Sequence, residues 1–156
     1  MRKEDLSFFD RAPVRHVFEA SIRATRSEVF AAIADPTTWP DWFPGVRAAR
    51  YRGAPPHGIG TIREADVSGT HWVEEMLAWE PDRLWAYTVV ASSTPLAKAQ
   101  VESFELEDVP GVSRGPNSTA PGVYRNPTAT DEFVAETVAG MNYLKAICRD
   151  LDIPVE

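Results

Sequence analysis

The stretch DPTTWPDWFPGV at residues 35–46 decides how this chain folds. Just before it, Thr25 and Glu28 have the spacing of a helix capping box, and apolar residues at helical spacing follow them. Pro36 disfavours helical geometry in the residue before it, so this helix should end there. A second short helix or turn is expected over 36–42.

Alternating apolar and polar residues predict strands on both sides of this stretch. One half-buried strand is expected before it, at 14–24. After it, short loops separate the predicted strands, which favours an antiparallel meander. The strands expected there are 46–52, 61–67, 71–80, 84–92 and 97–107.

The chain is expected to close with a long amphipathic helix over about 130–151, where apolar residues recur at spacings of three and four. Residues 108–128 are rich in Gly and Pro. A segment this long that lacks secondary structure is usually functional or disordered. Within it, Val112 and Val123-Tyr124 are candidates for a short edge strand. This order of elements suggests a curved sheet around a helix, with a cavity between them.

The size and composition of the chain fit one globular domain. It has 156 residues, of which 44% are hydrophobic and 25% charged, enough to bury a core. We expect a single domain over 14–156. Residues 1–13 are expected to be a lead-in segment that Phe8 and Phe9 pin to the surface.

The charge of the chain argues against nucleic acid as a partner. The chain has 16 basic and 23 acidic residues, for a net charge of −7. Nucleic acids and anionic membranes bind clusters of Lys and Arg. The single cysteine, Cys148, suits a reducing compartment. No apolar run suggests a signal peptide or a transmembrane helix, so we expect a cytoplasmic protein without stable membrane insertion.

Three segments resemble the polyketide cyclase/dehydrase-like branch of the START-related (SRPBCC) superfamily: 29–46, 58–67 and 73–90. That branch has a Trp-containing turn after a helix, a Gly-Thr start to a strand, and a W-x-P-x-R-L hairpin. The hairpin residues here are Trp79, Pro81, Arg83 and Leu84. The resemblance implies an α+β helix-grip fold, in which a curved antiparallel β-sheet wraps around a long C-terminal α-helix and encloses a cavity.

The resemblance also implies a function, although fold alone does not decide it. The first expectation is binding of a hydrophobic small molecule, such as a polyketide, lipid or quinone. An alternative is a cyclase or dehydratase that uses a pocket carboxylate, and a weaker one is a protein-interaction module. The chain departs from the family at 108–128, where the family places a last strand and this sequence has a Gly/Pro-rich segment.

The hairpin at 80–83 divides the strands around it into two faces, and both are largely apolar. We expect the first to face inward: Val73, Glu75, Leu77, Trp79, Leu84, Ala86, Thr88 and Val90. The second would then be an outer apolar patch suited to a homodimer: Trp72, Glu74, Met76, Ala78, Trp85, Tyr87 and Val89. If the faces are reversed, the second face is the pocket wall.

Three charged residues are candidates for chemistry. Glu75 on an inward face would lie among apolar neighbours, where desolvation raises a carboxyl pKa and suits it to proton transfer, but it could instead face solvent. Glu102 is a second candidate carboxylate, and it could also face solvent. Glu75 could also bond to Thr88. Arg63 could anchor an anionic or carbonyl group, or form a surface salt bridge.

The other expected ligand contacts are aromatic or apolar. Trp39, Trp42 and Phe43 occupy the place of a cavity entrance in the family, as an aromatic gate or as a hydrophobic plug. The remaining expected ligand contacts are Leu77, Thr88, Val90, Phe104, Met141 and Leu144. His16, His57 and His71 lack the spacing of metal ligands, and no phosphate loop or dinucleotide motif occurs, so neither a metal nor a cofactor is expected.

Overall fold

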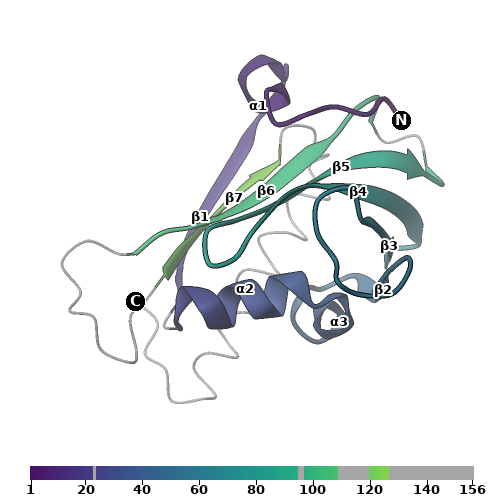
Figure 1. The fold of residues 1–156 in the computed structure, drawn as a ribbon. Coiled ribbons are helices and arrows are strands. Elements are labelled where there is room, and N and C mark those ends of the chain that lie inside the picture. The colour runs from purple at the N-terminus through teal and green to yellow at the C-terminus, as the bar shows by residue number, and fades with distance from the viewer. Residues whose placement is uncertain (23, 95–96, 109–119, 127–156) are drawn as a thin grey trace.

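The computed structural model describes residues 1–22, 24–94, 97–108 and 120–126. Seven strands form one sheet in which every neighbouring pair is antiparallel, in the order β1-β7-β6-β5-β4-β3-β2 (Figure 1). The strands are β1 (His16–Ile22), β2 (Val46–Tyr51), β3 (Ile62–Val67), β4 (Thr70–Glu80), β5 (Leu84–Ser92), β6 (Val101–Leu106) and β7 (Ala120–Asn126). The expected C-terminal helix, with Met141 and Leu144, lies outside the described residues.

The segment around the Trp-rich stretch forms three short helical elements, where one helix and one short helix or turn were expected. They are α2 (Arg26–Ala34), the 3-10 helix η1 (Pro36–Thr38) and α3 (Trp39–Trp42). The capping box is present, because the Thr25 side chain accepts from the Glu28 backbone N–H and the Glu28 carboxylate accepts from the Thr25 backbone N–H. The helix ends where Pro36 begins the next element.

The predicted strands agree with the structure within a few residues, and β5 has the predicted bounds. The segment that contains Val123-Tyr124 is a strand, but it is not at the edge. It is β7, and it pairs with β1 on one side and with β6 on the other. The family's last strand is therefore present here despite the Gly and Pro residues in its sequence.

The inward face of the central hairpin is the opposite of the one expected, except that Trp79, which was expected inward, does pack against the main core. Along β4, burial alternates so that Trp72, Glu74, Met76 and Ala78 are buried. Trp72 and Met76 belong to the main core with Trp85 of β5 and the apolar residues of α2 and α3. The outer aromatic patch predicted for a homodimer is thus the core-facing side of the sheet.

The other face of the sheet is apolar because the N-terminal segment covers it. The short helix α1 (Phe8–Arg11) lies across the sheet from α2 and α3 (Figure 1). Phe8 and Phe9 form a second buried cluster with Ala99 and Val101, and Leu77 packs against it. The lead-in segment therefore contributes to the core through Phe8 and Phe9.

The pairing of β4 with β5 contains two register shifts. Glu75 lies opposite Thr88, Trp79 opposite Trp85 and Glu80 opposite Leu84. The shift between Met76 and Ala78 leaves the extra residue on β4, as in a bulge, which places two residues of one strand opposite one of the other.

Candidate functional site

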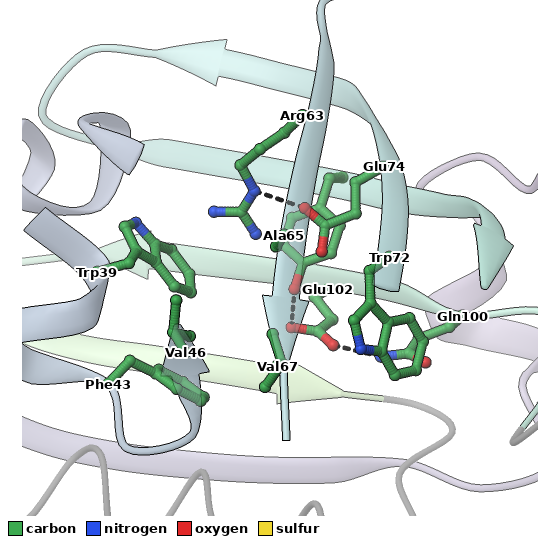
Figure 2. Close-up of a pocket in the computed structure, with 11 residues that line it drawn as sticks. Trp39, Phe43, Val46, Arg63, Ala65, Val67, Trp72, Glu74, Gln100 and Glu102 are labelled. Atoms are coloured by element: carbon green, nitrogen blue, oxygen red, sulfur yellow. Dashed lines mark hydrogen bonds and ion pairs between the residues drawn. The ribbon is translucent and has the colours of Figure 1, made fainter. Parts of the chain in front are cut away.

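A small pocket lies between the inward face of the sheet and the turn that carries α3 (Figure 2). Its volume is about 20 Å³, roughly the room that one water molecule needs. Residues from five strands and the α3 segment line it: Trp39, Phe43, Val46, Arg63, Ala65, Val67, Trp72, Glu74, Tyr87, Gln100 and Glu102. The pocket thus combines apolar rings with a set of buried polar groups.

An ion pair crosses one wall of this pocket. Arg63 of β3 lies opposite Glu74 of β4 in the sheet register, and its Nε donates to the Glu74 carboxylate. The two side chains are 1% and 5% exposed. Burial alone would lower the pKa of Arg63, but the charge of Glu74 raises it above its ordinary value, so the guanidinium stays charged.

Three aromatic rings surround the Arg63 guanidinium. Its carbon lies 4.1 Å from the ring centroid of Trp39, 4.6 Å from that of Trp85 and 4.8 Å from that of Tyr87. These distances are within the range of cation–π attraction. The rings and Glu74 thus hold the guanidinium in one place.

One nitrogen of Arg63 has no hydrogen-bond acceptor among the described residues. This is Nη1, a fully buried donor. A buried donor without an acceptor costs free energy that a suitable acceptor would recover. Arg63 lines the pocket, so the pocket wall contains a charged group with a buried N–H donor that lacks an acceptor among the described residues.

Two buried side chains contact Glu102: Tyr87 of β5 and Gln100, which lies just before β6. Tyr87 of β5 lies opposite Glu102 of β6, and its hydroxyl donates to the Glu102 carboxylate. The Gln100 side-chain amide donates to the other carboxylate oxygen. All three are no more than 4% exposed, so Glu102 is a buried carboxylate at the pocket, not a solvent-facing one.

The structure brings some of the predicted site residues together. Trp39, Phe43, Arg63 and Glu102 line the pocket. Phe104 is half-buried beside them, with its ring centroid 5.9 Å from that of Trp39. Arg63 is fully buried, so the alternative of a surface salt bridge is wrong.

The aromatic side chains after α2 form a plug in this structure. Trp39, Trp42 and Phe43 are each 4–5% exposed, and their rings pack against one another. The Trp39 Nε1 donates to the Ile33 carbonyl oxygen over 2.8 Å, which fixes the ring over Arg63. Trp39 and Phe43 line the pocket, whereas Trp42 does not.

Four predicted ligand contacts lie on the other face of the sheet: Glu75, Leu77, Thr88 and Val90. Glu75 is partly exposed and its carboxylate pairs with Lys3 at 2.6 Å. Thr88 is buried beneath the N-terminal segment, where its hydroxyl accepts from the Glu4 backbone N–H. These placements are the consequence of the reversed faces, and they remove Glu75 from the pocket.

Glu74, Tyr87 and Gln100 line the pocket but were not among the expected ligand contacts. Glu74 and Tyr87 belong to the face that was expected to point outward, which is the pocket wall in the reversed alternative. The one available signal was a carboxylate, Glu74, placed between the large apolar residues Trp72 and Met76 with period two. Such a buried charge needs a partner, and Arg63 supplies it.

Two further observations concern the described part of the chain. No group of three or more His, Cys, Asp or Glu side chains there could hold a metal ion. None of its helices has the length and apolar character needed to cross a membrane.

A larger groove of about 640 Å³ lies beside Tyr51 and Trp79, but it is at the surface, and its charged residues Asp35 and Arg50 are exposed.

Solved structures share this fold at low sequence identity. A START superfamily protein from Mycobacterium smegmatis superposes with a TM-score of 0.65 at 12% identity, over 88% of this chain and 99% of that one. The major latex-like protein 151 of Panax ginseng superposes with a TM-score of 0.61 at 12% identity, over 85% and 95% of the two chains. These likenesses concern the fold alone.

Sequence comparison gives a relative and a family. The chain is 29% identical over 110 residues to an uncharacterised protein of Mycobacterium tuberculosis. The match covers 70% of this chain and 66% of the relative, just under two thirds of its length. The family model described as polyketide cyclase / dehydrase and lipid transport matches residues 14–147, most of the chain. The chain therefore belongs to this family.

Proposed function

We propose that this protein binds a hydrophobic small molecule, of polyketide-, lipid- or quinone-like character, in the pocket beneath α3. The observation that carries the proposal is the Arg63 Nη1 donor, which is buried in an aromatic-lined pocket without an acceptor among the described residues. Ligand pockets are typically apolar with a few fixed polar groups that orient the ligand. Arg63 would be the orienting group here.

The lining supports an apolar ligand body. Trp39, Phe43 and Trp72 present rings to the pocket, and Val46 and Val67 complete an apolar wall (Figure 2). Flat rings bury much apolar area and stack well against other flat groups.

The size of the pocket sets a condition on binding. About 20 Å³ admits one oxygen-sized group, so a larger molecule enters only if side chains move. Trp39 and Phe43 are the candidates, because they come from a short helical turn and not from the sheet. In this proposal the aromatic plug and the aromatic gate are the same residues in two positions.

The test is a titration with a neutral naphthalene ketone dye, 6-propionyl-2-dimethylaminonaphthalene, whose fluorescence reports an apolar site. We expect wild-type protein to bind it, and Ala65→Leu, which adds bulk at the pocket wall, to weaken binding at least about tenfold. Ala48→Leu is the matched control, since Ala48 lies on the neighbouring strand and is exposed. Binding that Ala65→Leu leaves unchanged would place the dye elsewhere and contradict the proposal.

A second test needs no added probe. Native mass spectrometry of the purified protein, followed by denaturing extraction, would detect a bound apolar molecule and give its class. Circular dichroism spectra of both variants would show that they keep the fold.

A second candidate function is catalysis by a pocket carboxylate. The observation that favours it is Glu102, which is buried at the pocket and bonded by Tyr87 and Gln100. A carboxyl and a phenol in contact can pass a proton to or from a bound molecule. This enzyme would use Glu102 and not Glu75. Glu102→Gln would abolish turnover of a demonstrated substrate while leaving its binding, and full activity of that variant would exclude the role.

A further inference from the structure

We infer that this pocket selects uncharged ligands with a carbonyl-type oxygen and rejects carboxylates of the same shape, because Glu74 already neutralises Arg63. The inference rests on the proposed function and narrows its ligand class. It departs from the simpler expectation that a buried arginine attracts an anion.

The described wall of the pocket has more carboxylates than cations. Among the described residues that line the pocket, Arg63 is the only cation, and Glu74 and Glu102 are carboxylates. Glu74 makes a buried ion pair with Arg63. A ligand carboxylate that reached Arg63 would lie close to the charge of Glu74 in a place that water does not screen, and like charges repel strongly there.

A ligand cannot readily take the place of Glu74 beside Arg63. The Glu74 carboxylate is 5% exposed, so displacing it would leave a buried charge without its partner. Breaking a buried pair in this way is far more costly than breaking an exposed one. An anionic ligand must therefore bind in addition to Glu74 and not in exchange for it.

Arg63 keeps bonding capacity beyond its bond to Glu74. Its Nε donates to Glu74, and the aromatic rings of Trp39, Trp85 and Tyr87 lie near the guanidinium. Nη1 is a buried NH2 group without an acceptor among the described residues. A neutral carbonyl oxygen can accept from it without bringing a second negative charge close to Glu74.

The experiment compares two probes that differ in charge and hardly in shape. They are 2-acetylnaphthalene, a neutral ketone, and 2-naphthoate, a carboxylate at pH 7.5. Each is titrated into wild-type protein by isothermal calorimetry. We expect the ketone to bind at least about tenfold more tightly than the carboxylate.

Two variants assign the selectivity to Glu74. Glu74→Gln keeps a side-chain oxygen for Arg63 and removes the charge, so the preference for the ketone should fall at least about tenfold. Glu75→Gln makes the same change on the adjacent residue of β4, on the other face of the sheet, and should leave the preference unchanged. If Glu74→Gln does not fold, the wild-type comparison decides alone.

The outcomes separate this inference from the function on which it rests. Binding of 2-naphthoate as tight as that of the ketone in wild-type protein would overturn the inference and keep the pocket. Binding of neither probe would overturn both. Equal loss of preference in both variants would overturn the role of Glu74.

Discussion

Arg63 of β3 and Glu74 of β4 lie opposite each other in the sheet, and their ion pair is almost completely buried within a cluster of aromatic rings. Removing one partner leaves an uncompensated charge in the core, whereas replacing both with apolar residues does not. We predict that Glu74→Ala lowers the free energy of unfolding by about 3–5 kcal/mol. The double variant Arg63→Met/Glu74→Leu should recover most of that loss in urea unfolding.

An exposed pair supplies the control for this prediction. Glu80 pairs with Arg83 at the β4–β5 turn, where the side chains are 45% and 63% exposed. Glu80→Ala should cost no more than about 1 kcal/mol. A Glu74→Ala variant with a loss as small as this would show that the buried pair is not held as described.

The positions of most strands could be predicted from the sequence, but the inward face of the central strands could not. Periodicity located β1 to β6, and Pro36 located the end of α2, because strand alternation and proline geometry are local. Which face of β4 points inward depends on packing against residues that are distant in the sequence. Phe8 and Phe9 cover the outer face, so Leu77 is apolar although it does not face the main core.

The site could be predicted only in part for the same reason. Arg63, Glu102, Trp39 and Phe43 were expected and do line the pocket. Their partners Glu74 and Tyr87 were placed on the wrong face, and Glu75 was given their role. Two apolar faces on one strand make the alternation ambiguous, and only the packing of other elements resolves it.

The N-terminal segment gives a second prediction. Phe9 is 9% exposed and belongs to the cluster on the outer face of the sheet. Phe9→Ala should lower the free energy of unfolding by about 3 kcal/mol through lost burial and an added cavity. Hydrogen exchange should also quicken at the Glu4 amide, which donates to Thr88.

Leu6 is the matched control in the same segment, since it is 37% exposed. Leu6→Ala should change stability by about 0.5 kcal/mol or less. If Phe9→Ala behaves like Leu6→Ala, the segment does not pack on the sheet in solution.

Tyr51 gives a prediction for alkaline pH. Its hydroxyl donates to the Ala34 carbonyl oxygen over 2.8 Å, and burial raises the pKa of Tyr51 to about 12. An unfolded tyrosine has a pKa near 10, so the unfolded chain loses this proton first. Stability from this group is therefore intact below about pH 10 and falls as the pH rises toward about 12.

The measurement is the free energy of unfolding against pH for wild-type protein and Tyr51→Phe. The wild-type curve should fall more steeply than the variant curve between about pH 10 and about 12, by up to about 1.4 kcal/mol per pH unit. At pH 8 the variant should be less stable by about 1 kcal/mol, since the hydrogen bond is lost. Parallel curves above pH 10 would contradict the raised pKa.

The capping box of α2 gives a prediction for acid pH. The backbone N–H of Thr25 donates to the Glu28 carboxylate at 2.7 Å, and this bond, with that of the Thr25 hydroxyl, lowers the pKa of Glu28. Because the pKa of Glu28 is lowered, the stabilisation is present above its pKa in the unfolded chain. It is lost as the pH falls through its pKa in the folded protein. Thr25→Ala should cost about 1 kcal/mol at pH 7, and Ser27→Ala, at an exposed position of the same helix, less than about 0.5 kcal/mol. Glu28→Gln should flatten the acid limb of the unfolding curve measured by circular dichroism, and an unchanged acid limb would mean that the carboxylate does not cap the helix.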